Sequence, residues 1–219
     1  MKKNINAVLF DLDGTLVDTA GDLGNALNLV LQARSLPPLS QNIIRPMAGR
    51  GCNGLLKIGL DIAEGHPEYS LLCEELLNYY AKHACDTTVL FAGMEQVLNQ
   101  LEKTRTPWGI VTNKPMRFTT PLIEFLGLSN KAACVISGDT LSKSKPHPDQ
   151  ILHACDLLGI SPATCLFVGD SEVDVLASKA AGSPVVTALY GYIPAEENPH
   201  HWNADGYINH PEEILSWLN

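Results

Sequence analysis

The chain has 219 residues, 45% of them hydrophobic and 18% charged, which is enough for one large domain or two small ones with a packed core. Its net charge of −9 argues against nucleic acid and anionic membrane surfaces as partners, because both repel an acidic protein. The sequence contains no apolar stretch long enough to span a membrane, and its six cysteines lack the C-x-x-C spacing of zinc and redox sites. We therefore expect a cytoplasmic protein with free thiols, and the composition leaves its oligomeric state open.

The first predicted strand covers residues 5–11 and leads into two acidic side chains. Asp11 and Asp13 are two residues apart, so an extended backbone directs both to the same side, and Gly14 allows a sharp turn behind them. One carboxylate of such a pair can act as a nucleophile while the other transfers protons. The alternative is an ordinary turn at a strand end, where Asp and Gly are common.

The segment from residue 15 to about residue 88 predicts successive helices and no convincing strand. Apolar side chains recur at helical spacing over 19–34, and a second long helix is expected from Pro67 to about His83. In this second helix we expect four side chains to be buried, namely Leu71, Leu72, Leu76 and Tyr79.

A glycine-rich segment lies between these two helices. Gly49-Arg50-Gly51-Cys52-Asn53-Gly54 formally matches the dinucleotide-binding pattern G-x-G-x-x-G, but no strand precedes it, so the match is weak. We interpret it as a loop that places Arg50 or Arg45 near an anionic or polar part of a substrate. The alternative is that it simply joins two helices.

Beyond residue 90 the pattern alternates between strands and helices. We expect strands at 107–112, 133–137, 164–168 and 184–189, and helices at 94–103, 116–126, 148–158 and 172–181. Such alternation predicts an α/β fold with a doubly wound parallel sheet and helices on both faces. The domain assignment that follows is an α/β core of residues 1–15 and 90–219, and an inserted helical cap of residues 16–89. Its hinges are expected near 15–20 and 85–92.

Polar clusters follow the predicted strands and one loop of this core. Thr112 and Asn113 end one strand, Asp170 follows another, and Asp174 comes four positions later. Open α/β sheets bind ligands at the carboxyl ends of their strands, so these groups are expected to meet Asp11. Taken alone, Thr112 could be a plain turn former, and Asp174 could be an acid at a helix N-terminus.

One lysine is expected to join these groups from the loop Ser144-Lys145-Pro146. Pro146 restricts the backbone behind Lys145, which favours it over the neighbouring Lys143 as the functional lysine.

The run Asp11-Leu12-Asp13-Gly14-Thr15, together with Thr112, Lys145 and the acidic pair Asp170 and Asp174, resembles the four motifs of the haloacid dehalogenase superfamily of aspartate-nucleophile phosphatases. The resemblance spans essentially the whole chain. It implies a Rossmann-like hydrolase core with a helical cap, and a Mg²⁺-dependent phosphomonoesterase that works through a phosphoaspartate.

The resemblance also implies roles for the individual residues. Asp11 would be the nucleophile and Asp13 the general acid and base, while Thr112 and Asn113 would bind the phosphoryl group and Lys145 would neutralise charge. Mg²⁺ prefers hard oxygen ligands, which here would be the carboxylates of Asp11 and Asp170 and the main-chain carbonyl of Asp13. Asp174 would hold a metal-bound water or orient Lys145.

The expected substrate is a small phosphorylated metabolite. The segment Val111 to Pro115 and the segment Arg45 to Gly51 resemble phosphoglycolate phosphatases and N-acetylmuramic acid 6-phosphate phosphatases, and both kinds of substrate carry a carboxylate. The tail from Tyr190 to Ile193 resembles the second group more. Besides Arg45 and Arg50, Arg117 is a candidate substrate contact.

Two alternatives remain open at this point. A sugar phosphomutase of the same superfamily would keep all four motifs and differ in the cap. A phospho-accepting receiver domain also uses Asp, Thr and Lys on an α/β sheet, but it would be shorter and would lack a helical insertion.

Overall fold

The computed structural model describes residues 4–218, so residues 1–3 and 219 of the expected core lie outside the described part of the chain. Six parallel strands form the central sheet in the order β5-β4-β1-β6-β7-β8. Their bounds are β1 Ala7–Phe10, β4 Trp108–Val111, β5 Cys134–Ile136, β6 Cys165–Gly169, β7 Val185–Ala188 and β8 Gly206–Ile208. The predicted α/β class with a parallel sheet is confirmed. Strand β8 was not expected, because three residues are too few to show a pattern of alternation.

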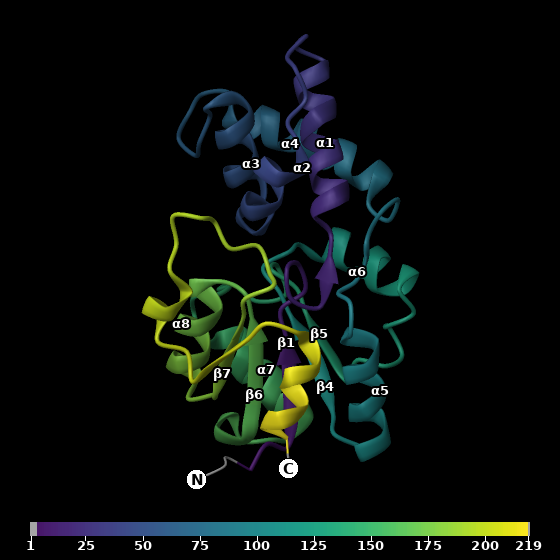
Figure 1. Cartoon of the computed structure of the whole chain (residues 1–219), viewed down its shortest axis with the longest axis vertical. Helices are drawn as coiled ribbons and strands as arrows, with labels where there is room; N and C mark the ends of the chain where they lie inside the picture. The colour runs from purple at the N-terminus through teal and green to yellow at the C-terminus, as the bar shows by residue number, and fades with distance from the viewer. Residues whose placement is uncertain (1–3, 219) are drawn as a thin grey trace.

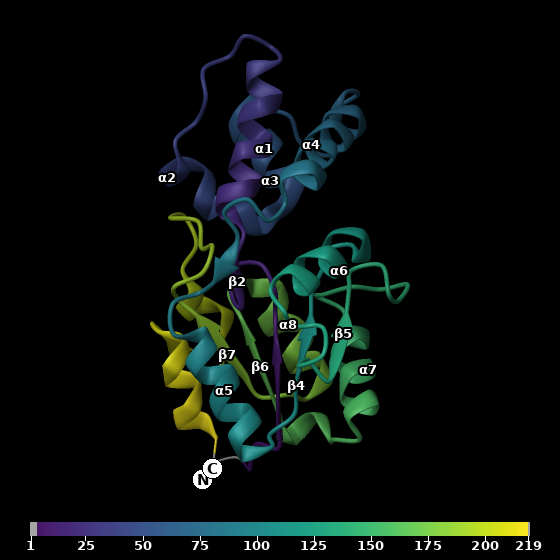
Figure 2. The ribbon, with the colours of Figure 1, turned by 90° about the vertical axis from the view of Figure 1, so that its right-hand side faces the viewer.

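Helices cover both faces of this sheet, as the residue pattern of the strands requires. In β1, Val8 and Phe10 pack on one side and Ala7 and Leu9 on the other, and all four are fully buried. The first side is covered by α5 (Met94–Thr104), α6 (Met116–Phe125) and the 3₁₀ helix η4 (Pro211–Trp217). The second side is covered by α7 (Asp149–Leu158) and α8 (Glu172–Ala181), so that Figure 2 shows helical layers flanking the strands. Two short 3₁₀ helices, η2 (Pro162–Thr164) and η3 (Pro199–Trp202), lie in the connections.

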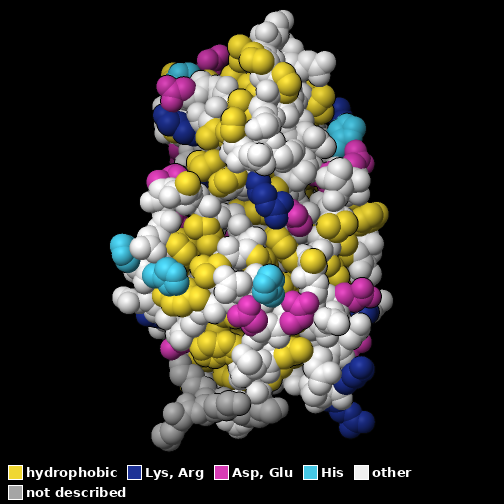
Figure 3. Space-filling model, viewed as in Figure 1, with side chains coloured by type: hydrophobic (Ala, Val, Ile, Leu, Met, Phe, Trp, Pro, Cys, Tyr) yellow, Lys and Arg dark blue, Asp and Glu magenta, His cyan; other side chains and the backbone are white. Residues whose placement is uncertain are grey.

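A group of helices sits beyond the carboxyl ends of the strands (Figure 1). It consists of α1 (Ala20–Gln32), α2 (Gln41–Ile44), the 3₁₀ helix η1 (Arg45–Arg50), α3 (Gly51–Leu60) and α4 (Tyr69–His83). This group has its own hydrophobic cluster, into which Phe118 of α6 and Tyr192 of the core also pack. On the face drawn in Figure 3, basic and acidic side chains lie together at the level where these helices meet the core. Within residues 4–218, no helix is both long and apolar enough to cross a bilayer.

The prediction for the buried side of α4 was partly wrong. Leu72 and Leu76 are buried as expected, but the third member of the stripe is Tyr80, and Leu71 is 67% exposed. Residues 72, 76 and 80 follow one another at intervals of four, which keeps them on one face of the helix.

The glycine-rich segment is not the loop that we expected. It runs through η1 directly into α3, with Gly51 at the junction in a backbone conformation of positive φ (56°). Leu55 and Leu56 are fully buried in the hydrophobic cluster of the cap, so tertiary packing stabilises a helix that the three glycines disfavour.

Two short strands lie between the core and these helices, and the first of them falls within residues 15–88, where we expected no strand. Strand β2 (Val17–Asp18) pairs antiparallel with β3 (Val89–Leu90). The paired residues of β2 and β3 are about seventy positions apart in the sequence, so local periodicity could not reveal these strands. We propose that this strand pair is the hinge region between a cap of residues 16–89 and the core.

Candidate active site

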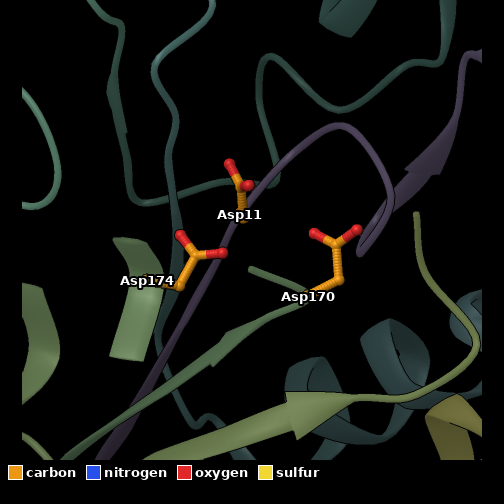
Figure 4. Close-up of side chains that lie close together, drawn as sticks. All are labelled: Asp11, Asp170 and Asp174. Carbon is orange, nitrogen blue, oxygen red and sulfur yellow. The ribbon is translucent and has the colours of Figure 1, made fainter. Parts of the chain in front are cut away.

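Three carboxylates converge where β1 and β6 end (Figure 4). Asp11 follows β1, Asp170 follows β6, and Asp174 lies in the first turn of α8; one oxygen of each lies within 4.8 Å of the others. The parallel strands deliver these groups to one edge of the sheet, and α8 turns Asp174 back toward them. Gly14 permits this packing, because it has a φ of 84° and any Cβ there would collide with the Asp170 carboxylate.

Lys145 is the cation of this cluster. Its Nζ lies 2.9 Å from Asp11 Oδ1 and 2.7 Å from Asp174 Oδ1, and it also donates to the main-chain oxygen of Val111. Burial acts to lower the pKa of Lys145, but Asp11 and Asp174 outweigh burial and raise it, so the ammonium form is held. Lys143 is exposed and approaches His147 instead.

Asp174 does two things at once. Its Oδ1 accepts from Lys145, while its Oδ2 accepts from the main-chain N–H and the hydroxyl of Ser171, which completes a capping box at the start of α8. Asp174 is therefore both an acid at a helix N-terminus, which was the alternative expectation, and a hydrogen-bond partner of Lys145.

Burial disfavours the charged forms of the other two acids. It raises the pKa of Asp11 to about 7 even though Lys145 acts to lower it, and Asp174 adds to the increase. Burial also raises the pKa of Asp170 well above its usual value, with Asp11 and Asp174 contributing. The hydrogen bonds to Asp170 come from neutral donors, the Tyr192 N–H at 2.7 Å and the Thr15 hydroxyl at 3.1 Å.

The donor set of this cluster suits a hard divalent cation. Three carboxylates lie together here, and the Lys145 ammonium contacts two of them, Asp11 and Asp174. Burial, and then the charges of Asp11 and Asp174, raise the pKa of Asp170, and a divalent cation would offset both effects. The carboxylate of Asp13 is directed elsewhere, so any contribution of Asp13 to the metal site would come from its main chain.

Asp13 is held by contacts on two sides. Its Oδ1 accepts from the Thr19 hydroxyl at 2.5 Å, and both of its oxygens accept from Lys114 Nζ at 2.9 and 3.2 Å. The Lys114 ammonium lies 4.6 Å from the centroid of the Tyr80 ring of α4. Burial acts to lower the pKa of Lys114, but Asp13 and Tyr80 reverse this and raise it.

Thr112 and Asn113 lie beside the carboxylates at the end of β4. The Thr112 hydroxyl accepts from the Lys114 N–H, and the Asn113 side chain exchanges two hydrogen bonds with the main chain of Lys145. Gln150 of α7 is fully buried and links the same groups, because it accepts from the Lys145 N–H and donates to the carbonyl oxygen of Thr112. Asn113 therefore positions the lysine loop in addition to lining the cavity.

A cavity of about 430 Å³ lies above these residues, between the core and the helical cap. Its floor is polar and includes Asp11, Asp13, Thr112 and Asp170. Its walls are mainly apolar and come from α1, α4, α6 and the segment after β7, with Leu23, Leu76, Leu77, Tyr80, Phe118, Tyr192 and Pro194. The remaining wall is the junction of η1 and α3, at Gly49 to Cys52.

The three predicted arginines are placed differently. Arg50 lines the cavity, and its guanidinium forms an ion pair with Glu197 and lies 3.7 Å from Glu196. Arg45 is not among the lining residues: its Nη1 donates to both carboxylate oxygens of Asp18, and its guanidinium lies over the rings of Phe91 and Tyr192.

Arg117 is exposed on α6, lies over the ring of the adjacent Phe118, and is also not among the lining residues. Only Arg50 of the three is thus brought to the cavity in this structure.

Sequence reasoning missed several residues of this site. Lys114 follows Thr112 and Asn113 directly and could have been noticed for that reason, and Ser171-x-x-Asp174 is a recognisable capping box. Thr19, Gln150 and Tyr192 carry no such signal, because each reaches the site only through tertiary packing.

Comparison with known proteins agrees with this geometry. Residues 8–188 match the haloacid dehalogenase-like hydrolase family. The N-acetylmuramic acid 6-phosphate phosphatase of Pseudomonas aeruginosa is 35% identical over 218 residues, which cover 100% of this chain and 96% of that protein. The phosphoglycolate phosphatase of Xanthomonas campestris is 38% identical, covering 95% of this chain and 94% of that protein. A solved structure described as a predicted phosphoglycolate phosphatase from Haemophilus somnus has a TM-score of 0.84 at 28% identity and covers 97% of both chains. The chain therefore belongs to the haloacid dehalogenase-like hydrolase family, and it is an enzyme of the phosphatase type.

Proposed function

We propose that this phosphatase is Mg²⁺-dependent and acts through a phosphoaspartate formed on Asp11. The observation that carries the proposal is the placement of Asp11 at the floor of the cavity, 2.9 Å from the Lys145 ammonium and beside two further carboxylates. Phosphoryl transfer requires a positioned nucleophile and neutralisation of charge on the transferring group, and these residues can supply both. Mg²⁺ would be held by Asp11, Asp170 and the Asp13 main chain, and would neutralise phosphoryl oxygens when bound.

The protein residues would then divide the reaction into two steps. Asp11 attacks phosphorus, a bond from its carboxylate oxygen to phosphorus forms, the ester P–O bond breaks, and Asp13 donates a proton to the departing alkoxide. Asp13 then accepts a proton from the water that cleaves the phosphoaspartate, which releases phosphate and restores Asp11. Thr112 and Lys145 hold the phosphoryl group in both steps.

The substrate that we propose is a small phosphorylated acid, with a phosphorylated amino-sugar acid favoured over 2-phosphoglycolate. A cavity of about 430 Å³ with largely apolar walls lies in the size range of pockets that enclose ligands larger than a two-carbon acid. N-acetyl and ether substituents of a sugar acid would contact the leucines and Phe118 of these walls. Arg50, in the cavity wall at the junction of η1 and α3, is the candidate partner for the carboxylate of the substrate.

A screen of phosphate esters tests this proposal directly. Turnover of N-acetylmuramic acid 6-phosphate, 2-phosphoglycolate and p-nitrophenyl phosphate should require Mg²⁺ and should disappear when the metal is chelated. The Asp11→Asn enzyme should be inactive on every ester, while Asp156→Asn, at an exposed position of α7, should retain normal turnover. Retained activity of Asp11→Asn would refute the assignment of the nucleophile.

Membership of the family excludes the receiver-domain alternative. The phosphomutase alternative predicts a different result, because a mutase requires a bisphosphate activator and interconverts isomers. Addition of a sugar bisphosphate should leave the rate of phosphate release unchanged and yield no isomer if the enzyme is a hydrolase.

A further inference from the structure

Tyr192, in the tail after β7, contacts both the cap and the core of the active site. The residue is 4% exposed, its ring packs in the hydrophobic cluster of the cap, and it lines the cavity. Its main-chain N–H donates to Asp170 Oδ2 at 2.7 Å. Its phenol reaches the N-terminus of α1, more than 170 residues earlier in the chain.

The phenol oxygen is the acceptor for two main-chain N–H groups at the start of α1. The first N–H groups of a helix need acceptors, and a threonine at the N-cap usually offers its own hydroxyl. At the start of α1, however, the hydroxyl of the N-cap residue Thr19 donates to Asp13. The Tyr192 phenol oxygen accepts from the N–H groups of Thr19 and Ala20 at 2.7 and 2.9 Å instead.

The remaining contacts hold the phenol in this orientation. Its hydroxyl donates to Asp18 Oδ1 at 2.8 Å, and Asp18 is in turn bound by Arg45, whose guanidinium lies 5.2 Å from the centroid of the Tyr192 ring. The phenol hydrogen is therefore committed to Asp18, which leaves the oxygen free to accept from α1.

We propose that Tyr192 is a positioning residue for Asp13: by binding the main-chain N–H groups of Thr19 and Ala20, it fixes Thr19 so that its hydroxyl holds the proposed general acid in place. This inference rests on the proposed function, since it assigns Asp13 the role of proton donor. Without the phenol, these two N–H groups lose their acceptor, and Thr19 is no longer held with its hydroxyl directed at Asp13. Asp13 then loses one of its two partners and keeps only Lys114.

The test compares Tyr192→Phe with Thr19→Val, and with the double variant, on two kinds of ester. One is p-nitrophenyl phosphate, whose leaving group departs with little protonation; the other is the alkyl phosphate with the highest turnover in the screen, whose leaving group needs a proton. The ratio kcat/KM is measured because it covers the steps up to departure of the alcohol. Tyr207→Phe removes a phenol that contacts the main chain of His200 and serves as the matched control.

We expect Tyr192→Phe and Thr19→Val each to lower kcat/KM about tenfold or more on the alkyl phosphate and by no more than about twofold on the aryl phosphate. The double variant should be no worse than the more damaging single variant, because both changes break the same connection. Thr19→Ser should restore the alkyl activity. The Mg²⁺ concentration for half-maximal activity of Tyr192→Phe should be unchanged, since its main-chain N–H to Asp170 is retained.

Equal losses on the two esters, no loss on either, or multiplied losses in the double variant would overturn the inference. If Tyr192→Phe fails to fold, Thr19→Val and Thr19→Ser still test the connection to Asp13. Failure of the proposed function is a separate result, because it would be seen in other proteins: the wild-type protein would hydrolyse neither ester, or Asp11→Asn would retain activity.

Discussion

At the scale of single residues, the site is organised by an imbalance of charge. Asp11, Asp170 and Asp174 lie close together, and the buried ammonium of Lys145 contacts two of them, Asp11 and Asp174. Burial raises the pKa of Asp11 and Asp170, so protons and a divalent cation compete for the same oxygens. This competition should make the stability of the metal-free protein depend on pH.

The metal-free protein should lose stability as the pH rises. The pKa of an aspartate is ~3.9 in an unfolded chain, whereas burial raises the pKa of Asp11 to about 7 in the folded protein. The folded state binds the proton more tightly, so the contribution of this group is complete below the unfolded pKa and is lost as the pH rises through about 7. Thermal unfolding in chelator should therefore show a falling Tm between about pH 5 and about pH 8, and the Tm increase caused by Mg²⁺ should grow over the same range.

Asp11→Asn is the control for this measurement, because it removes one of the two carboxylates with a raised pKa and should make both trends shallower, leaving the part that Asp170 contributes. A Mg²⁺-induced shift of equal size at both ends of the pH range would contradict the interpretation.

Mg²⁺ binding should require glycine at position 191, because the structure leaves no room there for a side chain. A Cβ at this position would lie 2.5 Å from Asp170 Oδ2 and from the carbonyl oxygen of Gly14, which is too close for any contact. We expect Gly191→Ala to push Asp170 away and to raise the Mg²⁺ concentration for half-maximal activity by about tenfold or more, as partners of metal ligands commonly do. The matched control is Gly49→Ala, whose Cβ would meet the Tyr192 Cβ at an ordinary 3.4 Å, and which should leave that concentration unchanged.

At the scale of elements, the junction of η1 and α3 presents Arg50 to the cavity, and Glu197 reaches it from the loop after β7. The ion pair thus connects cap and core across the opening. It is half-exposed, and an exposed ion pair of this kind contributes little stability. Its position therefore points to binding of an anionic substrate group, which would compete with Glu197 for the guanidinium.

Arg50→Ala should raise KM for a carboxylate-bearing phosphate by about tenfold, the value of one charge-assisted hydrogen-bond pair, and leave p-nitrophenyl phosphate within about twofold. Arg117→Ala is the comparison, because Arg117 is exposed on α6 and does not line the cavity, so KM should stay unchanged on both esters. Steady-state kinetics on the two substrates separate these cases. An equal change of KM on both esters in Arg50→Ala would remove Arg50 from the list of substrate contacts.

At the scale of the whole molecule, the protein has hydrophobic clusters on both faces of the sheet and another in the cap. Phe118 and Tyr192 belong to the core by sequence but pack in the cluster of the cap. The edge-to-face contact between Phe118 and Tyr80, with ring centroids 5.6 Å apart, lies in the cavity wall. Packing of the cap and the shape of the cavity therefore depend on the same side chains.

Leu27→Ala should destabilise the protein through the cluster of the cap. Leu27 is fully buried in α1, and truncation of such a leucine lowers the free energy of unfolding by ~2–5 kcal/mol. Leu71→Ala, at a position of α4 that is 67% exposed, should change it by no more than ~0.5 kcal/mol. Urea denaturation of the two variants provides the measurement, and similar values for both would contradict the packing described for the cap.

Much of the α/β core could be predicted because its elements follow local rules. The four strands predicted beyond residue 90 and the helices between them appear close to their predicted bounds, since their apolar residues alternate or recur at helical spacing. Helix α3 and the pair β2–β3 could not be predicted in this way. Helix α3 forms despite three glycines, because burial of Leu55 and Leu56 stabilises it. Strands β2 and β3 form only because they pair with each other from the two ends of the cap.

The sequence by itself determined that Asp11, Thr112 and Asp170 stand at the carboxyl ends of strands, and a parallel sheet places such ends along one edge. The structure added the strand order, in which β4 and β6 flank β1. Only the tertiary structure decided that Lys114 and Thr19 hold Asp13, that Tyr192 binds the start of α1, and that Arg45 faces Asp18 while Arg50 faces the cavity. These contacts join residues up to 173 positions apart, and their geometry arises from the way the cap packs on the core, which no local pattern of residues encodes.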